Sequence, residues 1–202
     1  GTGPKYLATH SSLTNFQRRP NARNDPALDV SGSSATTDLA AAWTTGTTFT
    51  IALRMKQRSA VSFGAIFSDT GGNAAIYFDT ANFNYYYTGA SHVNSTAVAL
   101  NTWYDYAFSV SAGAGTHYLN GKADGTAASV VSGDLSQIGI NGIGERIDGL
   151  LDYLYFWNRA LTAQEILALR ADPYEMFQQP ASRRAFYFAT SGAQTVAVGQ
   201  AT

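Results

Sequence analysis

The chain has 202 residues, no cysteine, 13% charged residues and a formal net charge of −1. Because no repeat or internal linker divides the sequence, the length favours one large β-sandwich over two small domains. The missing cysteines exclude a disulfide framework and a thiolate metal site. The chain carries no basic stripe, which argues against a nucleic-acid partner. No apolar run approaches the roughly 20 residues that a membrane span needs.

The N-terminal segment, residues 1–26, is polar, irregular and interrupted by prolines, so we interpret it as an extended arm. Its few apolar anchors include Tyr6, Leu7 and Phe16. Ordering one residue of backbone costs roughly 1–2 kcal/mol, which so few anchors cannot offset in an isolated arm. We therefore expect a homo-oligomer or an assembly-bound protein in which an arm contacts another chain.

Alternation of apolar and polar residues predicts half-buried strands, the first of them at residues 49–56. In residues 49–56, the side chains of Thr50, Arg54 and Lys56 fall on the face opposite the apolar ones, because successive strand side chains point to opposite faces. The apolar face carries Phe49, Ile51, Leu53 and Met55. Further strands are predicted at residues 61–67, 74–79, 83–88, 103–110, 116–119, 136–140 and 151–158.

Turn signals separate these segments, and they include Asn120-Gly121, Asp124-Gly125 and Asn141-Gly142. Asn-Gly supplies the positive φ angles of a two-residue hairpin. Many short strands joined by regular turns predict a β-sandwich.

One helix is predicted at residues 162–170. Thr162 and Glu165 have the spacing of a capping box, in which the two side chains bind each other's backbone N–H groups. Asp172-Pro173 ends the helix, because the residue before a proline avoids the α region. Leu161 flanks the cap, and the expected buried stripe consists of Ile166, Leu167 and Leu169.

Several segments resemble the laminin-G-like, concanavalin-A-like lectin/glucanase superfamily. Residues 149–162 resemble the family's closing strand, and residues 27–32 followed by 49–56 resemble its opening pair of strands. Trp103 and the hairpin at residues 118–122 resemble its central tryptophan and Tyr-x-Asn-Gly-Lys turn. The resemblance implies an all-β, two-sheet antiparallel jelly-roll sandwich with one short C-terminal helix. It also implies a structural role for Asp152.

The sequence after the helix resembles laminin-G-like modules of tailed-phage and prophage virion proteins, through residues 171–177 and Arg183-Arg184. We therefore expect a jelly-roll domain at residues 27–188 and a C-terminal linker or arm at residues 189–202. The resemblance implies a location in the virion, with secretion as the alternative. The expected partners are other virion proteins or a cell-surface glycan.

The sequence has few residues that could form a catalytic site. Glycoside hydrolases on this fold use closely spaced carboxylates as nucleophile and general acid, and Glu145 with Asp148 is the one close pair, which we interpret as a solvated loop. His10, His92 and His117 are scattered, unlike the spacing of a metal motif, and we expect surface or hydrogen-bonding roles for them. We predict that the protein is not an enzyme.

An aromatic segment at residues 83–88, with polar residues after it, is the best candidate for glycan or partner contact. Sugar recognition uses aromatic faces beside polar hydrogen-bonding groups. Alternation puts Tyr85 and Tyr87 on the face opposite Tyr86, so one set is expected in the core. The alternative is that all are β-formers that pack the sandwich. The candidate contact residues are Tyr85, Tyr86, Tyr87, His92 and Asn94.

No cofactor is required by these motifs, but the family resemblance implies that calcium can bind at the sheet rim through Asp, Asn and backbone oxygens. The candidate ligands are Asp69, Asn73 and Asn141. The alternative is that these residues shape their turns by bonding to their own backbone.

The predicted function is a non-catalytic binding or structural module of a phage virion, either for tail adhesion or for capsid decoration. A secreted bacterial carbohydrate-binding domain attached to an enzyme is the first alternative. A glycoside hydrolase is the second.

Overall fold

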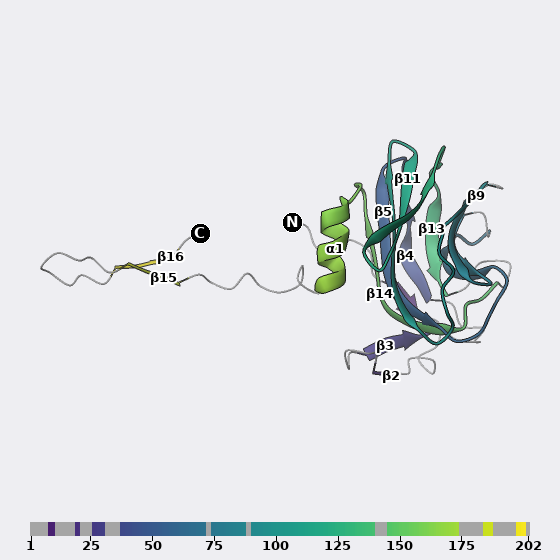
Figure 1. Ribbon diagram of the computed structural model, residues 1–202, viewed down its shortest axis with the longest axis horizontal. Helices are drawn as coiled ribbons and strands as arrows, with labels where there is room; N and C mark the ends of the chain where they lie inside the picture. The colour runs from purple at the N-terminus through teal and green to yellow at the C-terminus, as the bar shows by residue number, and fades with distance from the viewer. Residues whose placement is uncertain are drawn as a thin grey trace, which may run out of the picture.

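The computed structural model describes residues 8–10, 19–20, 26–30, 37–71, 74–87, 90–139, 145–173, 184–187 and 197–200. Two antiparallel sheets pack face to face, and one helix of the described residues lies against the outer side of one sheet (Figure 1). This architecture confirms the predicted jelly-roll sandwich with a short C-terminal helix.

The first sheet, here called the helix-free sheet, has the strand order β1-β4-β13-β6-β7-β8-β9. Every pair of neighbouring strands in it is antiparallel. Its strands are β1 (Ala8–His10), β4 (Thr37–Thr44), β6 (Gly64–Ser68), β7 (Ala74–Asp79), β8 (Asn82–Tyr87), β9 (Ala90–Val93) and β13 (Asp134–Ile138).

The second sheet, here called the helix-side sheet, has the order β12-β11-β10-β5-β14-β3-β2. The helix α1 (Ala163–Ala171) covers part of its outer face (Figure 1). Its strands are β2 (Arg19–Pro20), β3 (Pro26–Asp29), β5 (Phe49–Gln57), β10 (Trp103–Ser111), β11 (Ala114–Leu119), β12 (Lys122–Ala127) and β14 (Gly149–Trp157).

The predicted arms contain three short strands, which are β1, β2 and β16. Within residues 1–26, β1 pairs with β4 and β2 pairs with β3, so the backbone of this segment extends both sheets. Near the C-terminus, β15 (Arg184–Tyr187) pairs with β16 (Ala197–Gln200) in a separate antiparallel ladder. The expected arm anchors Tyr6, Leu7 and Phe16 lie outside the described residues.

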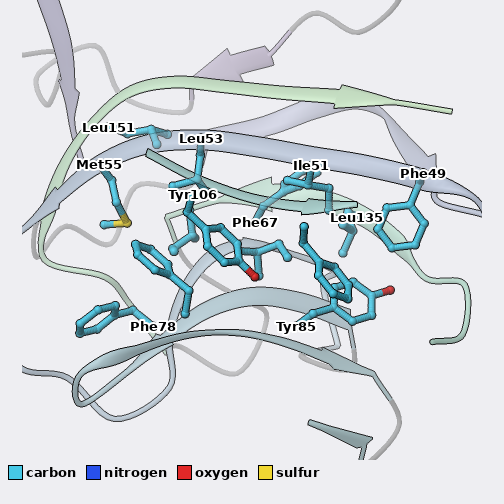
Figure 2. Packing of buried hydrophobic residues seen from close by; sticks show 14 of the residues in the cluster. Phe49, Ile51, Leu53, Met55, Phe67, Phe78, Tyr85, Tyr106, Leu135 and Leu151 are labelled. Atoms are coloured by element: carbon cyan, nitrogen blue, oxygen red, sulfur yellow. The ribbon is translucent and has the colours of Figure 1, made fainter. Parts of the chain in front are cut away.

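The hydrophobic core fills the space between the sheets (Figure 2). Phe49, Ile51, Leu53 and Met55 of β5 point into it, as the alternation predicts. Burying a side chain of this size stabilises the fold by roughly 1.5–3 kcal/mol, so this one strand makes a large contribution. The helix-free sheet contributes Trp43, Phe67, Phe78, Tyr85 and Leu135, among others.

The second face of β5 is buried too, which corrects the prediction of a half-buried strand. Thr50 is 0% and Arg54 7% exposed. The cause is tertiary, because α1 and the segment before it cover this face. Residues of the helix and of this segment pack on strand residues in a second apolar cluster. The cluster consists of Ala52, Ala107, Tyr153, Leu161, Ile166 and Leu169.

The capping box of α1 is confirmed. Glu165 N–H donates to Thr162 Oγ1 over 3.2 Å, and Thr162 N–H donates to Glu165 Oε2 over 2.8 Å. Ile166 and Leu169 are buried as expected, but Leu167 is 52% exposed, so its predicted burial is wrong. Successive helical residues are rotated by about 100°, and Leu167 falls outside the narrow stripe that meets the sheet.

Of the two turns predicted around the β11–β12 hairpin, one is confirmed and the other is wrong. Asn120 and Gly121 have φ angles of 52° and 79°, as their predicted hairpin turn requires. Asp124-Gly125 lies inside β12 instead of forming a turn. The register of β11 and β12 shifts between Thr116 and Tyr118, and this bulge accommodates the dipeptide.

Candidate functional site

The predicted glycan-contact residues do not form one surface. Tyr85 is fully buried and points into the core (Figure 2), where its hydroxyl donates to the Val131 carbonyl over 3.0 Å. Asn94 is 2% exposed and joins the backbone N–H of Phe83 to the carboxylate of Asp124. Both residues are therefore structural, which corrects their assignment to a surface site.

Tyr86 and His92 lie on opposite sides of the helix-free sheet. Tyr86 is partly exposed on the outer face, where its ring meets that of Tyr77 edge to face at 6.3 Å. His92 pairs with the core residue Tyr85 across β8 and β9, and burial lowers its pKa. The side chain of Tyr87 lies outside the described residues.

Tyr77 is the centre of an aromatic group on the outer face of the helix-free sheet. Its neighbours along β7, Ile76 and Phe78, face the core, so Tyr77 points outward. The ring of Phe63 lies 5.5 Å from that of Tyr77. We call the set of Phe63, Tyr77 and Tyr86 the aromatic face.

Phe63 is the exposed member of the aromatic face. Its side chain is 45% exposed, and its backbone has a φ of 55°. The left-handed conformation costs a residue with a Cβ about 1–2 kcal/mol, and for a bulky residue it is rare. The sequence predicts Phe63 within a strand at residues 61–67, whereas β6 begins at Gly64. No local pattern in the sequence indicates a phenylalanine in the left-handed conformation.

Polar groups line the aromatic face. The hydroxyl oxygens of Tyr77 and Ser91 are 2.9 Å apart, and Ser91 Oγ donates to Asn84 Oδ1 over 3.3 Å. Burial raises the pKa of Tyr77, although its hydrogen bond with Ser91 opposes the shift. The phenol therefore stays neutral, and hydroxyl and amide groups stand beside the rings.

Asp148, one of the two carboxylates considered for catalysis, takes part in structural contacts, and so does Glu165. Asp148 accepts hydrogen bonds from Arg58 Nε over 3.2 Å and Ser59 Oγ over 2.6 Å. Glu165 belongs to the capping box and pairs with Arg159 over 2.8 Å.

The calcium candidates show one turn-shaping contact. The Oδ1 atom of Asp69 accepts the backbone N–H of Gly71 over 2.9 Å, as in an Asx-turn. Asn73 and Asn141 lie outside the described residues. Within the described ranges, no group of three or more His, Cys, Asp or Glu side chains could hold a metal ion.

Comparison with known protein families shows the superfamily to which the chain belongs. The family model of the concanavalin A-like lectin/glucanases superfamily matches residues 29–167. The chain belongs to this superfamily. A search of curated protein sequences found no significant match. None of the helices in the described part of the chain is long and apolar enough to cross a membrane.

Solved structures of other superfamily-like domains share the fold at low sequence identity. Domain 4 of AbnA, an extracellular GH43 arabinanase from Geobacillus stearothermophilus in complex with arabinotriose, is 16% identical, with a TM-score of 0.55 and coverage of 81% of this chain and 87% of that one. A putative carbohydrate-binding protein from Bacteroides ovatus is 17% identical, with a TM-score of 0.53 and coverage of 60% and 40%. The botulinum neurotoxin serotype G binding domain is 11% identical, with a TM-score of 0.64 and coverage of 86% and 48%.

Proposed function

We propose that this superfamily member is a non-catalytic glycan-binding module that uses the aromatic face. The observation that carries the proposal is the exposed ring of Phe63, held in a left-handed backbone conformation and packed on Tyr77. Strained residues of this kind cluster at binding and active sites, where the rest of the fold compensates for their cost.

The chemistry of the aromatic face suits a sugar. The faces of Phe63 and Tyr86 offer apolar area to the C–H side of a pyranose or furanose ring. The exposed Ser91 offers a hydroxyl group to the sugar hydroxyls, and the buried Asn84 holds this group in place through Oδ1. The arabinotriose bound to the arabinanase domain and the carbohydrate-binding description of the Bacteroides protein support this ligand class.

The engaged carboxylates support the non-catalytic part of the proposal. Asp148 is held by Arg58 and Ser59, and Glu165 is held by the helix cap. A general acid or nucleophile needs a carboxyl group that can reach the glycosidic bond beside a second one.

Binding can be tested with the full chain on a glycan array and then by calorimetry with the oligosaccharides that bind. Phe63→Ala and Tyr86→Ala are expected to weaken binding at least about tenfold, or roughly 1.4 kcal/mol. Val131→Ala is the control, because Val131 is 42% exposed and takes no part in the aromatic face. Unchanged binding by both aromatic variants would refute this use of the face.

We also propose that the module belongs to a phage virion, as a tail adhesin or a capsid decoration protein. Residues 171–177 and Arg183-Arg184 support this location through their resemblance to virion proteins. The alternative is a secreted carbohydrate-binding domain attached to an enzyme. Immunogold electron microscopy of purified particles tests the location. An antibody against the protein labels tails or capsids if the protein belongs to the virion, and it labels neither if the protein is a secreted domain.

A further inference from the structure

A groove lies on the outer face of the helix-side sheet, on the opposite side of the sandwich from the aromatic face. It has a volume of about 410 Å³. We call it the arginine groove, and it is lined by Arg54, Trp103, Asp105, Asn120, Leu167 and Arg170.

Two strands, one hairpin turn and one helix form this groove. Arg54 of β5 and Asp105 of β10 are direct cross-strand partners on its floor. A Cβ at Gly121 would lie 3.0 Å from Leu167 Cδ1 and 3.2 Å from Arg170 Cδ. The glycine therefore lets the β11–β12 turn approach α1 closely, and turn and helix become the two walls.

Arg54 has a buried donor without a hydrogen-bond partner. Its Nη1 donates to Asp152 over 3.1 Å, and its guanidinium carbon lies 5.1 Å from the centre of the Trp103 ring. Its Nε is buried without a hydrogen bond, although it forms a long ion pair of 3.8 Å with Asp105 Oδ1. A buried donor left unpaired costs about 1–3 kcal/mol, so a group that accepts from Nε would stabilise the groove.

Asp105 determines which kind of acceptor fits. Its Oδ1 already accepts the hydroxyl of Tyr153 over 3.0 Å, and its charge disfavours an anionic ligand at the same place. The side-chain amide of Asn120 accepts the Asp105 N–H through Oδ1 over 3.1 Å. Its Nδ2 has no acceptor among the described residues, so it can donate to a ligand.

We propose that the arginine groove is a second saccharide site, in which a small shift of the Arg54 guanidinium lets one sugar hydroxyl accept from Arg54 Nε and donate to Asp105 Oδ1. A hydroxyl makes both bonds at once, whereas a carboxylate cannot donate and an ammonium group cannot accept. The two protein atoms are 3.8 Å apart, so the hydroxyl oxygen has to lie to the side of the line that joins them to be within hydrogen-bond distance of both. Trp103 and Leu167 provide apolar walls for the sugar's C–H groups. The site is independent of the aromatic face.

The test is an NMR titration of the full, nitrogen-15-labelled chain with methyl α-D-glucopyranoside, methyl α-D-mannopyranoside and methyl β-D-galactopyranoside, with sodium acetate as an anionic probe. At least one glycoside is expected to shift the Arg54 Nε–H and Trp103 indole signals with saturation, while acetate does not. Phe63→Ala is expected to leave these shifts unchanged, which separates the groove from the aromatic face.

A matched pair of variants locates the binding. Ala171 is exposed and lines the groove, so Ala171→Trp is expected to fill it and weaken binding at least about tenfold. Ala163→Trp makes the same change at the exposed first residue of α1, outside the groove, and is expected to have no effect. A response to acetate alone, a response to no probe, or unchanged binding by Ala171→Trp would each overturn the proposal.

Discussion

The hydroxyl oxygen of Tyr106 lies 2.8 Å from Nδ1 of His117 between the two sheets, and both side chains are almost completely buried. The imidazole ring of His117 also stacks on Phe108 at 4.4 Å. A charged imidazolium would lose its hydration there. Burial therefore lowers the pKa of His117 to about 4, with a further lowering by His92 and an opposing effect of Asp124.

This depressed pKa predicts a pH-dependent stability. The unfolded chain binds a proton on His117 near pH 6.5, but the folded chain binds it only near pH 4, so stability is lost as the pH falls between these values. Between pH 7 and pH 5 the loss from this group is about 2 kcal/mol. Urea denaturation at both pH values should show a smaller loss for His117→Gln than for the parent chain. Equal losses would assign the effect to carboxylates.

The helix cap should have a measurable effect on stability. Thr162→Ala is expected to lower the free energy of unfolding by about 1 kcal/mol, because it removes the acceptor of the Glu165 N–H. Thr162→Ser retains a hydroxyl and should lose less. Chemical denaturation of the three proteins is the measurement, and an unchanged midpoint for Thr162→Ala would contradict the cap.

The buried ion pair of Arg54 and Asp152 predicts strong coupling. The Asp152 side chain is fully buried, so Asp152→Leu leaves Arg54 without its main partner and should cost about 3–5 kcal/mol. The double variant Arg54→Met with Asp152→Leu removes both charges and should cost much less. A double-mutant cycle by denaturation measures the difference, and additive effects would argue against coupling.

Substitution of Phe63 is expected to change glycan binding without a large change in the free energy of unfolding. Asn tolerates the left-handed conformation, so Phe63→Asn should keep the free energy of unfolding within about 1 kcal/mol of the parent. Its loss of glycan binding should nevertheless match that of Phe63→Ala. A large loss of stability would mean that the ring is mainly a packing residue.

Catalysis is expected to be absent. Incubation with the polysaccharides that bind should release no reducing ends above the buffer control. If cleavage were detected and Glu145→Gln abolished it, the binding-module proposal would fail.

The sequence alone determined the superfamily, the inward face of β5 and the helix cap. These features depend on local periodicity and on short motifs such as Thr162-Ala-Gln-Glu165, which act over a few residues. It did not predict β4 or β12, because their alanine-rich and polar segments lack clear alternation.

Tertiary structure decided which side chains meet on each surface. Tyr85 and Tyr86 are neighbours in sequence, yet only Tyr85 is buried, because the two faces of the sheet meet different surroundings. The contacts of Arg54 likewise come from Trp103 and Asp152, which belong to the distant strands β10 and β14. The arginine groove also joins β5, β10 and α1, which lie far apart in the chain, and no local pattern encodes such contacts.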